Sequence, residues 1–332
     1  MGLLNKSELL KILRAIMGFD VNASPFAALE LKSDEPCFYR SSHTGFIQSK
    51  NYGSGNYAHI LLSHLRDSLQ VLKDEAVELS LDGSGVLKLS STDNVYESEI
   101  RVHTVRPEQA GLKTHNIGDI IYRLPAQVFQ GFDARPFICA AQPTLIDGRI
   151  MMPTQSGIVV WQGPQDLIPL SLYPRETMLK FISSSQNLEK VVVSSKGYWG
   201  AVAGGLISFI SGHTTGDTLY KSYNVAGKPL DTLPAERLIV SLEAAAGMCG
   251  DNKIEIDPLL GVVTRDTTGN QSRFAFGSHQ GWSKFAITGR TAKVIADALR
   301  QSSDTDTALV YVPTNQSMRL VRGNWQVNFR TF

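Results

Sequence analysis

One short pattern occurs three times in this chain at a constant spacing. Each copy has residues typical of two β-strands around a turn in which a hydroxyl residue precedes a glycine, and these glycines, Gly45, Gly157 and Gly269, lie 112 residues apart. This period is far too long for a solenoid repeat and matches the length of a small domain. The sequence therefore predicts three copies of one domain, with the pattern at residues 39–49, 151–161 and 263–273.

A second, independent pattern has nearly the same period. An apolar, strand-like stretch leads directly into a helix-like segment, and a predicted β-hairpin follows each helix. The alternative is an α+β protein without internal repeats, because strand–helix–hairpin units recur in many such folds. Two motifs that keep one spacing favour the repeat, with strand–helix segments at residues 57–72, 167–182 and 283–299 and hairpins at 77–89, 191–204 and 308–321.

Length and turn residues place the domain boundaries. The chain has 332 residues, which exceeds the roughly 250–300 residues that one hydrophobic core serves. Turn-forming residues at 115–119 precede a predicted strand, and the polar stretch 227–234, with two prolines, is typical of an extended linker. Each domain should contain helix, hairpin and strand twice, although the first helix of the middle domain, at residues 126–133, is short and broken by a glycine. We expect domains at residues 1–118, 119–230 and 231–332.

The N-terminal segment predicts an amphipathic helix. One face at 100° per residue is apolar and the opposite face is polar: the apolar residues are Leu9, Leu13, Ile16 and Met17, and the polar ones are Ser7, Lys11 and Arg14. Charged residues interrupt the segment, so it resembles neither a signal peptide nor a membrane span of about 20 apolar residues. The three cysteines are scattered and odd in number, which argues against a disulfide framework or a zinc site. We expect a soluble cytoplasmic protein.

The sequence lacks the short motifs that carry common enzyme chemistry. It contains no G-x-S-x-G elbow, no Walker A sequence, no H-E-x-x-H and no cysteine–histidine cluster. Asp251, Glu255, Asp257 and Asp266 are close enough in sequence to suggest a metal, but strand alternation around a turn at Pro258 explains them at least as well. We expect no enzymatic activity, no cofactor and no metal. An enzyme whose site has no recognisable motif is the alternative to this expectation.

Element order, domain length and domain number together resemble the DNA sliding clamps, especially the three-domain bacterial β clamp. The closest local similarity is at residues 152–160, which resemble the β-clamp strand carrying a Thr-Asp-Gly-His-Arg-Leu turn. Only the types of Thr154 and Gly157 match, with a one-residue offset, and the basic His-Arg pair is absent. The resemblance implies an α+β fold of three similar clamp domains, each with helices packed on antiparallel sheets, that form a ring by oligomerisation.

The resemblance also implies a function. Sliding clamps encircle double-stranded DNA without reading its sequence, tether a DNA polymerase as processivity factors, depend on a clamp loader and have no enzymatic activity. The expected assembly is a head-to-tail homodimer. The alternative is a clamp-like or other β-rich interaction or assembly protein that does not encircle DNA.

Lysine and arginine residues on the predicted helices are the candidate DNA contacts. A sliding protein needs dispersed cations that attract phosphates without contacting base edges. Any one of these side chains is equally well explained as a solvated residue on a wet helix face, and the formal net charge of +1 neither demands nor excludes nucleic acid. The candidates are Lys11, Arg14, Arg66, Lys73, Arg175, Lys180, Arg237, Arg290, Lys293 and Arg300.

The resemblance implies a groove for partner peptides between the second and third domains. Thr154 and Gly157 come from the matched turn, and the other residues are assigned by position, although Phe329 could instead pack in the core of its own domain. A neighbouring subunit is expected to pair with residues 96–105, at Ile100 and Val102, and near Met248. The full set of groove candidates is Thr154, Gly157, Ile158, Leu233, Pro234, Val327, Phe329 and Phe332.

Overall fold

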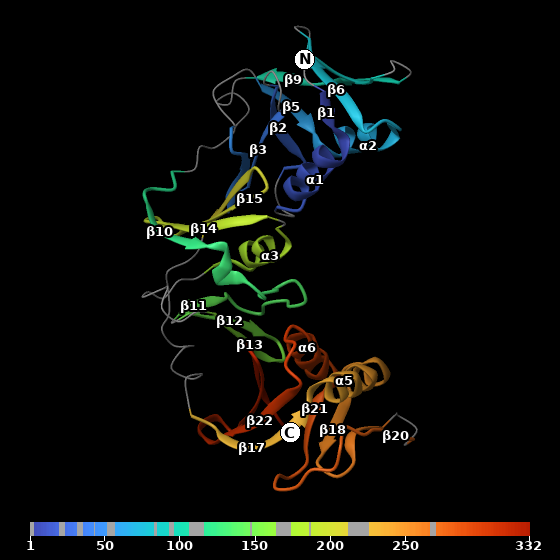
Figure 1. Cartoon of the computed structure of the whole chain (residues 1–332), viewed down its shortest axis with the longest axis vertical. Coiled ribbons are helices and arrows are strands. Elements are labelled where there is room, and N and C mark those ends of the chain that lie inside the picture. Colours follow the sequence, from blue (N-terminus) through green and yellow to red (C-terminus); the bar gives the residue numbers. More distant parts are fainter. Residues whose placement is uncertain are drawn as a thin grey trace. The chain divides into compact units, whose positions relative to one another are not determined.

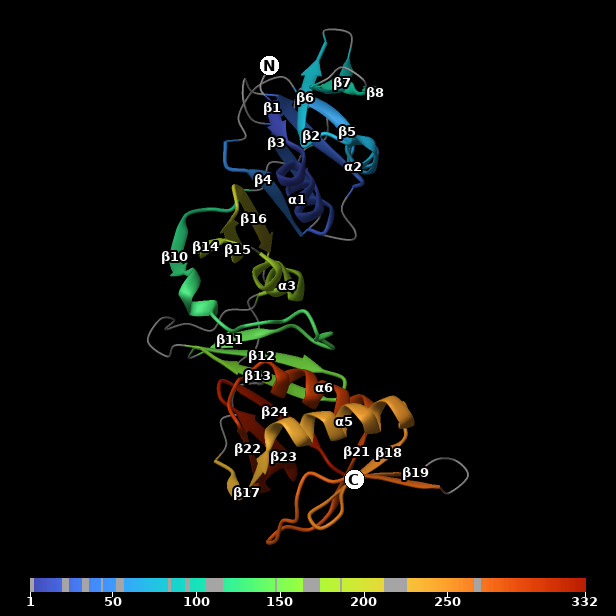
Figure 2. The same ribbon diagram turned by 45° about the vertical axis from the view of Figure 1, so that its right-hand side comes forward.

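A computed structural model of the chain divides into two compact units, which are described one at a time (Figures 1 and 2). The first unit comprises Met1–Ala126 with Ser185–Ser211, and the second comprises Gln127–Ser184 with Gly212–Phe332. The structure describes residues 3–19, 24–31, 36–42, 44–51, 57–82, 85–92, 96–105, 116–146, 148–163, 174–185, 187–211, 226–265 and 270–332.

The first unit contains two antiparallel sheets and two helices. One sheet has four strands in the order β1-β6-β7-β8, and the other has nine in the order β10-β14-β15-β16-β4-β3-β2-β5-β9. Helices α1 (Lys6–Met17) and α2 (Leu62–Val71) lie side by side in both views. The strands are β1 (Leu3–Asn5), β2 (Phe26–Leu31), β3 (Pro36–Ser41), β4 (Gly45–Ser49), β5 (Tyr57–Leu61), β6 (Ala76–Leu81), β7 (Val86–Ser91), β8 (Glu97–Arg101), β9 (His103–Val105), β10 (Ile120–Pro125), β14 (Leu188–Ser194), β15 (Tyr198–Ala203) and β16 (Leu206–Ser211).

Helix α1 forms for the reasons that its sequence predicts. The side chain of Asn5 accepts a hydrogen bond from the backbone N–H of Glu8 at 3.0 Å and caps the first turn. Leu9, Leu13 and Ile16 are buried. At the other end the guanidinium of buried Arg40 donates to the carbonyl oxygens of Ile16 and Met17, in the last turn, where carbonyls lack partners four residues further along the helix.

The second unit also contains two antiparallel sheets. One has seven strands in the order β11-β12-β13-β24-β23-β22-β17, and the other has four in the order β20-β19-β18-β21. Helices α5 (Ala235–Cys249) and α6 (Gly289–Arg300) run side by side (Figure 2), and α3 (Glu176–Ser184) is shorter. The remaining elements are β11 (Thr144–Ile146), β12 (Arg149–Thr154), β13 (Gly157–Gln162), β17 (Lys228–Pro234), β18 (Lys253–Asp257), β19 (Gly261–Arg265), β20 (Gln271–Phe274), β21 (Phe285–Thr288), β22 (Asp306–Val312), β23 (Ser317–Arg322), β24 (Trp325–Arg330) and the 3-10 helices η1 (Ala126–Phe129) and η3 (Pro313–Asn315).

The element order repeats three times along the chain. The first and third copies begin at β1 and at β17, and each consists of a strand, a helix, four strands, a second helix and three strands, to which the first copy adds the short strand β9. In the middle copy η1 stands where the others have a full helix, as the glycine-broken segment predicts. The expected middle strand at residues 167–172 lies outside the described residues. Residues 227–234, interpreted from sequence as a linker, instead form β17, an edge strand that accommodates Pro229 and Pro234.

Hydrogen-bonded strands join one copy of the repeat to the next. The last strand of the second copy, β16, pairs with β4 of the first, and the last strand of the third copy, β24, pairs with β13 of the second. Each junction therefore produces one continuous sheet across a predicted domain boundary. The boundaries near residues 118 and 230 stay a prediction, because the sheets and the two compact units do not separate there.

The repeated glycines lie where these strands meet. Gly45 is opposite Ile210, and a Cβ on Gly45 would overlap the carbonyl oxygen of Phe209. Gly157 has φ +149°, and a Cβ there would overlap the carbonyl oxygen of Asn328. The close approach of a neighbouring strand thus explains both glycines. Gly269 lies outside the described residues.

The turns before these glycines also share one hydrogen-bond pattern. The hydroxyl of Ser42 accepts from the N–H of Thr44 at 3.2 Å and donates to the carbonyl of Gly45 at 3.5 Å. The hydroxyl of Thr154 accepts from the N–H of Ser156 at 3.2 Å and donates to the carbonyl of Gly157 at 2.9 Å. Serine and threonine favour such turns because their side chains replace a backbone hydrogen bond.

Candidate partner groove, helix faces and sheet edges

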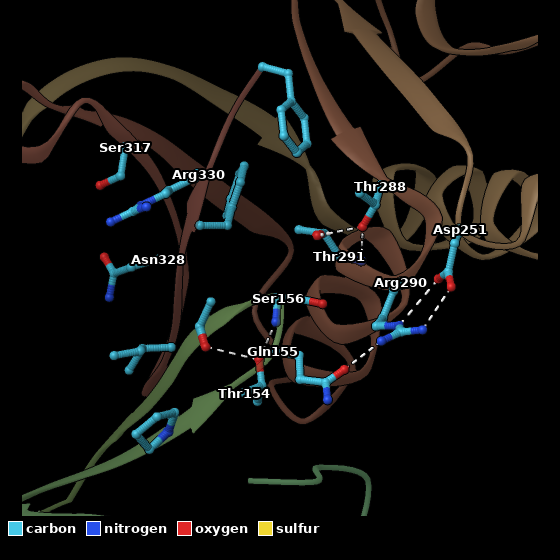
Figure 3. A pocket seen from close by; sticks show the side chains of 15 residues that line it. Thr154, Gln155, Ser156, Asp251, Thr288, Arg290, Thr291, Ser317, Asn328 and Arg330 are labelled. Atoms are coloured by element: carbon cyan, nitrogen blue, oxygen red, sulfur yellow. Dashed lines mark hydrogen bonds and ion pairs between the residues drawn. The ribbon is translucent and has the colours of Figure 1, made fainter. Parts of the chain in front are cut away.

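A cavity of about 870 Å³ opens in the second unit beside the turn between β12 and β13 (Figure 3). Its size falls in the usual range of ligand pockets, about 300–1,000 Å³. Five parts of the chain form it: the β12–β13 turn, the loop after α5, the start of α6, the first residue of β23, and the C-terminal end of β24 with Phe332 beyond it. The lining residues are Pro153, Thr154, Gln155, Ser156, Gly157, Ile158, Asp251, Thr288, Arg290, Thr291, Ser317, Asn328, Phe329, Arg330 and Phe332.

A network of polar contacts holds the α6 side of this groove. The guanidinium of Arg290 donates to both carboxylate oxygens of Asp251, at 3.2 and 2.7 Å, and to the side-chain oxygen of Gln155 at 2.5 Å. The hydroxyl of Thr288 caps α6 by accepting from the N–H of Thr291 at 3.1 Å. Figure 3 shows Arg290, Asp251 and Thr288 on one side of the pocket. The polar side chains on this side of the groove therefore already have hydrogen-bond partners within the chain.

Five of the eight predicted groove residues line this cavity: Thr154, Gly157, Ile158, Phe329 and Phe332. Phe332 is 80% exposed, whereas Phe329 is 1% exposed and contacts Phe285 with a ring separation of 6.2 Å, so it packs in the core as well.

The other three predicted groove residues lie elsewhere. Leu233 and Val327 are buried in strand pairs with Thr307 and Val159, and Pro234 is opposite Asp306. Sequence reasoning missed the polar half of the lining. The one sequence feature that indicated polar groups here is the alternation of polar and apolar residues in β24, which puts Asn328 and Arg330 on the same face of the strand.

A second cavity, of about 740 Å³, lies over α5 and α6. Its lining includes three carboxylates, Glu243, Asp251 and Asp297, together with Lys293 and Cys139. Burial raises the pKa of Asp297; Lys293 opposes the shift and Glu243 adds to it. Burial also raises the pKa of the Cys139 thiol to about 12, and the neighbouring charge of Glu176 contributes.

The ten predicted DNA-contacting cations differ in their surroundings. Four have a carboxylate partner: Arg66 with Asp67, Lys180 with Glu176, Arg290 with Asp251 and Arg300 with Glu243. Arg175 is partly buried. The remaining five are exposed on or next to helices, and they are Lys11, Arg14, Lys73, Arg237 and Lys293.

Each of the four sheets in the described chain is open and has two edge strands, and two of these edges bear on the predicted interface. Strand β8 is one edge of the four-stranded sheet of the first unit, and β20 is one edge of the four-stranded sheet of the second. Of the predicted interface residues, Met248 is 63% exposed, but Ile100 and Val102 are 8% and 9% exposed in their own chain. Replacing these two with arginine would therefore disturb the fold as well as any interface.

No family model and no curated protein matches this sequence, but solved structures match nearly the whole chain. A Pseudomonas aeruginosa DnaN sliding clamp bound to griselimycin is similar with a TM-score of 0.78 at 9% identity, with coverage of 100% of this chain and 98% of that one. The β chain of DNA polymerase III from Streptococcus pneumoniae TIGR4 gives 0.77 at 10% identity, with 99% and 98% covered. The Helicobacter pylori β clamp bound to a DNA ligase peptide gives 0.74 at 11% identity, with 99% of both chains covered.

The chain therefore has the fold of the bacterial DNA sliding clamps, as its repeat pattern predicts. No helix in the described residues is long and apolar enough to cross a membrane.

Proposed function

We propose that this protein is a DNA sliding clamp, which encircles double-stranded DNA as a head-to-tail homodimeric ring and tethers a DNA polymerase as its processivity factor. The fold match over the whole chain is the observation that carries the proposal. In this role the protein works in the cytoplasm with DNA and a clamp loader, has no enzymatic activity and needs no cofactor.

The two junctions within the chain support ring closure. Each pairs the last strand of one repeat with the fourth strand of the preceding repeat. The counterpart of β16 and β24 in the first repeat is β8, the third strand after its second helix, because the short β9 that follows pairs with β5 instead. The same rule therefore leaves β8 and β20, the fourth strand of the third repeat, as complementary edges. Pairing β8 of one copy with β20 of another extends the rule, and such heterologous contacts close into rings.

The register of the two internal junctions predicts the contacts of this third junction. Transferred to β8 and β20, this register would pair Glu97 with Arg273 and Glu99 with Gln271. Glu97 is also 3.5 Å from Lys88 in its own chain, so the new pair would extend an existing charge cluster. Pairing also covers two strand edges that would otherwise promote aggregation.

Retention on DNA should depend on topology more than on affinity. The five exposed cations and a net charge of +1 give weak, salt-sensitive attraction to phosphates. A closed ring nevertheless cannot leave a circular duplex.

The experiment that tests this function compares nicked circular DNA with the same DNA after linearisation, with a clamp loader and ATP supplied. We expect the protein to stay on the circle at moderate salt and to leave the linear form within minutes. Changing Lys11, Arg14, Lys293 and Arg300 together to alanine should weaken loading without changing the fold. Equal retention on both DNA forms would indicate ordinary surface binding and would reject the proposal.

A second candidate function is an assembly protein of clamp fold that does not encircle DNA. It is favoured by the ion pairs that neutralise four of the ten predicted DNA contacts. This alternative predicts a ring or polymer in solution that binds neither circular nor linear DNA, even with a loader and a polymerase present.

A further inference from the structure

A buried side-chain amide in the partner groove has a hydrogen-bond donor without an acceptor. Asn328 is 4% exposed and lines the cavity. Its Oδ1 accepts from Nε of Arg319 at 2.7 Å and from Nε2 of Gln326 at 3.1 Å. Because both partners are donors, the amide cannot be flipped, and its NH₂ group must point the other way. That Nδ2 atom is buried and has no partner among the described residues.

An unpaired buried donor has a free-energy cost that most proteins avoid. Asn328 lies on β24 between Ile158 of β13 and Arg319 of β23. Its Oδ1 has two partners, so only the Nδ2 donor is left without one among the described residues. The amide is therefore better explained by an acceptor that arrives with a ligand.

Arg330 adds a charge to the same end of the groove. It is two residues beyond Asn328 on β24, so both side chains are on one face of the strand. Arg330 is exposed, and its guanidinium makes no ion pair within the part of the chain that the structure describes. Figure 3 shows Arg330, Asn328 and Ser317 together on one side of the pocket, opposite Arg290. The β24 side thus carries the Nδ2 donor of Asn328 and the positive charge of Arg330. On the α6 side the charge of Arg290 is already paired with Asp251.

We infer that this end of the groove binds a carboxylate of an acidic peptide segment of a partner protein, with one oxygen accepting from Nδ2 of Asn328 and the other from the guanidinium of Arg330. A carboxylate fits better than an amide because it only accepts hydrogen bonds and because charge-assisted bonds are stronger. Apolar residues that follow it would contact Ile158 and the exposed ring of Phe332. The inference rests on the proposed function, since its occupant is the partner peptide of the clamp.

Four fluorescent peptides, acetyl-Xaa-Ser-Leu-Phe-amide with Xaa as Glu, Gln, Leu or Lys, test this inference by fluorescence anisotropy with the full chain. The Glu peptide should bind about tenfold more tightly than the Leu peptide, with Gln between them and Lys weakest. Asn328→Asp should abolish the preference for Glu, because a second acceptor replaces the Nδ2 donor and repels the peptide carboxylate. Asn328→Leu combined with Arg330→Ala should remove the preference, and Arg290→Ala, which alters the satisfied side, should keep it.

Circular dichroism and thermal melting establish that each variant folds, which matters most for Asn328→Leu because it also removes the acceptor of Arg319 and Gln326. Equal binding of all four peptides, or a Glu preference that survives Asn328→Leu with Arg330→Ala, would overturn the carboxylate site while leaving the groove in place. Failure of all four peptides to bind at millimolar concentration would overturn the site and the groove together. DNA retention would then still test ring formation independently.

Discussion

Replacing Gly45 with alanine adds one methyl group at the junction between β4 and β16. The new Cβ would overlap the carbonyl oxygen of Phe209 and lie 2.8 Å from the Cα of Ile210. These are backbone atoms, so no rotamer change relieves the contact, and the two strands must separate. Overpacking of this kind costs about 1–3 kcal/mol, and each lost ladder hydrogen bond adds about 1 kcal/mol.

A total near 3 kcal/mol should lower the melting temperature by roughly 6–12 °C for a cooperative unit of about 150–250 residues. Thermal unfolding followed by circular dichroism measures this shift. Gly247→Ala is the matched control, because Gly247 is in helix α5 with no atom near its Cβ position. That change should raise the melting temperature, since alanine favours a helix by about 0.5–1 kcal/mol over glycine. A Gly45→Ala protein that melts within 1–2 °C of the wild type, on the order of the measurement error, would refute the close approach of the strands.

Three further predictions concern the interface and two titrating groups. Glu97→Arg should weaken self-association about 30-fold, because the ring loses an ion pair worth about 1 kcal/mol at each of its two interfaces. Adding Arg273→Glu in the same chain should restore association. Sedimentation that is unaffected by the single change would reject the proposed register. Burial raises the pKa of Asp297, so its ionisation opposes folding; Asp297→Asn should melt higher at pH 7 and lose that gain as the pH falls toward the ordinary pKa of aspartate, and a gain independent of pH would contradict this. The Cys139 thiol, with its pKa raised to about 12 by burial and by Glu176, should react with iodoacetamide at pH 8 on the order of a thousandfold more slowly than an unperturbed cysteine, and rapid alkylation would show that it ionises freely.

The repeat could be recognised from sequence because the fold requires glycine at defined places. Gly45 and Gly157 are each needed where a strand of the next repeat comes closest, so their spacing reports the period of the domain. The same pattern does not show which strands meet there. The pairing of β16 with β4 joins residues about 160 positions apart. Sequence reasoning therefore could not predict that sheets continue from one repeat into the next.

The groove was only partly predictable for a similar reason. Thr154 and Ile158 belong to one local turn that sequence can identify. Asp251, Thr288 and Asn328 come from three separate elements, and only the folded chain brings them to one cavity. The burial of Ile100 in its own chain could not be predicted either. An edge strand has the same alternation of apolar and polar residues whether its apolar side faces its own core or a partner.

Covalent closure of the ring around DNA tests the central claim most directly. Glu97→Cys and Arg273→Cys in one chain place two thiols opposite each other if β8 and β20 of neighbouring copies pair as proposed, at a separation that suits a disulfide. After loading on nicked circular DNA and oxidation, the protein should remain on the circle in detergent and high salt, and it should be released by a reductant or by cutting the DNA. Cross-linked protein that washes off the intact circle under those conditions would contradict the account.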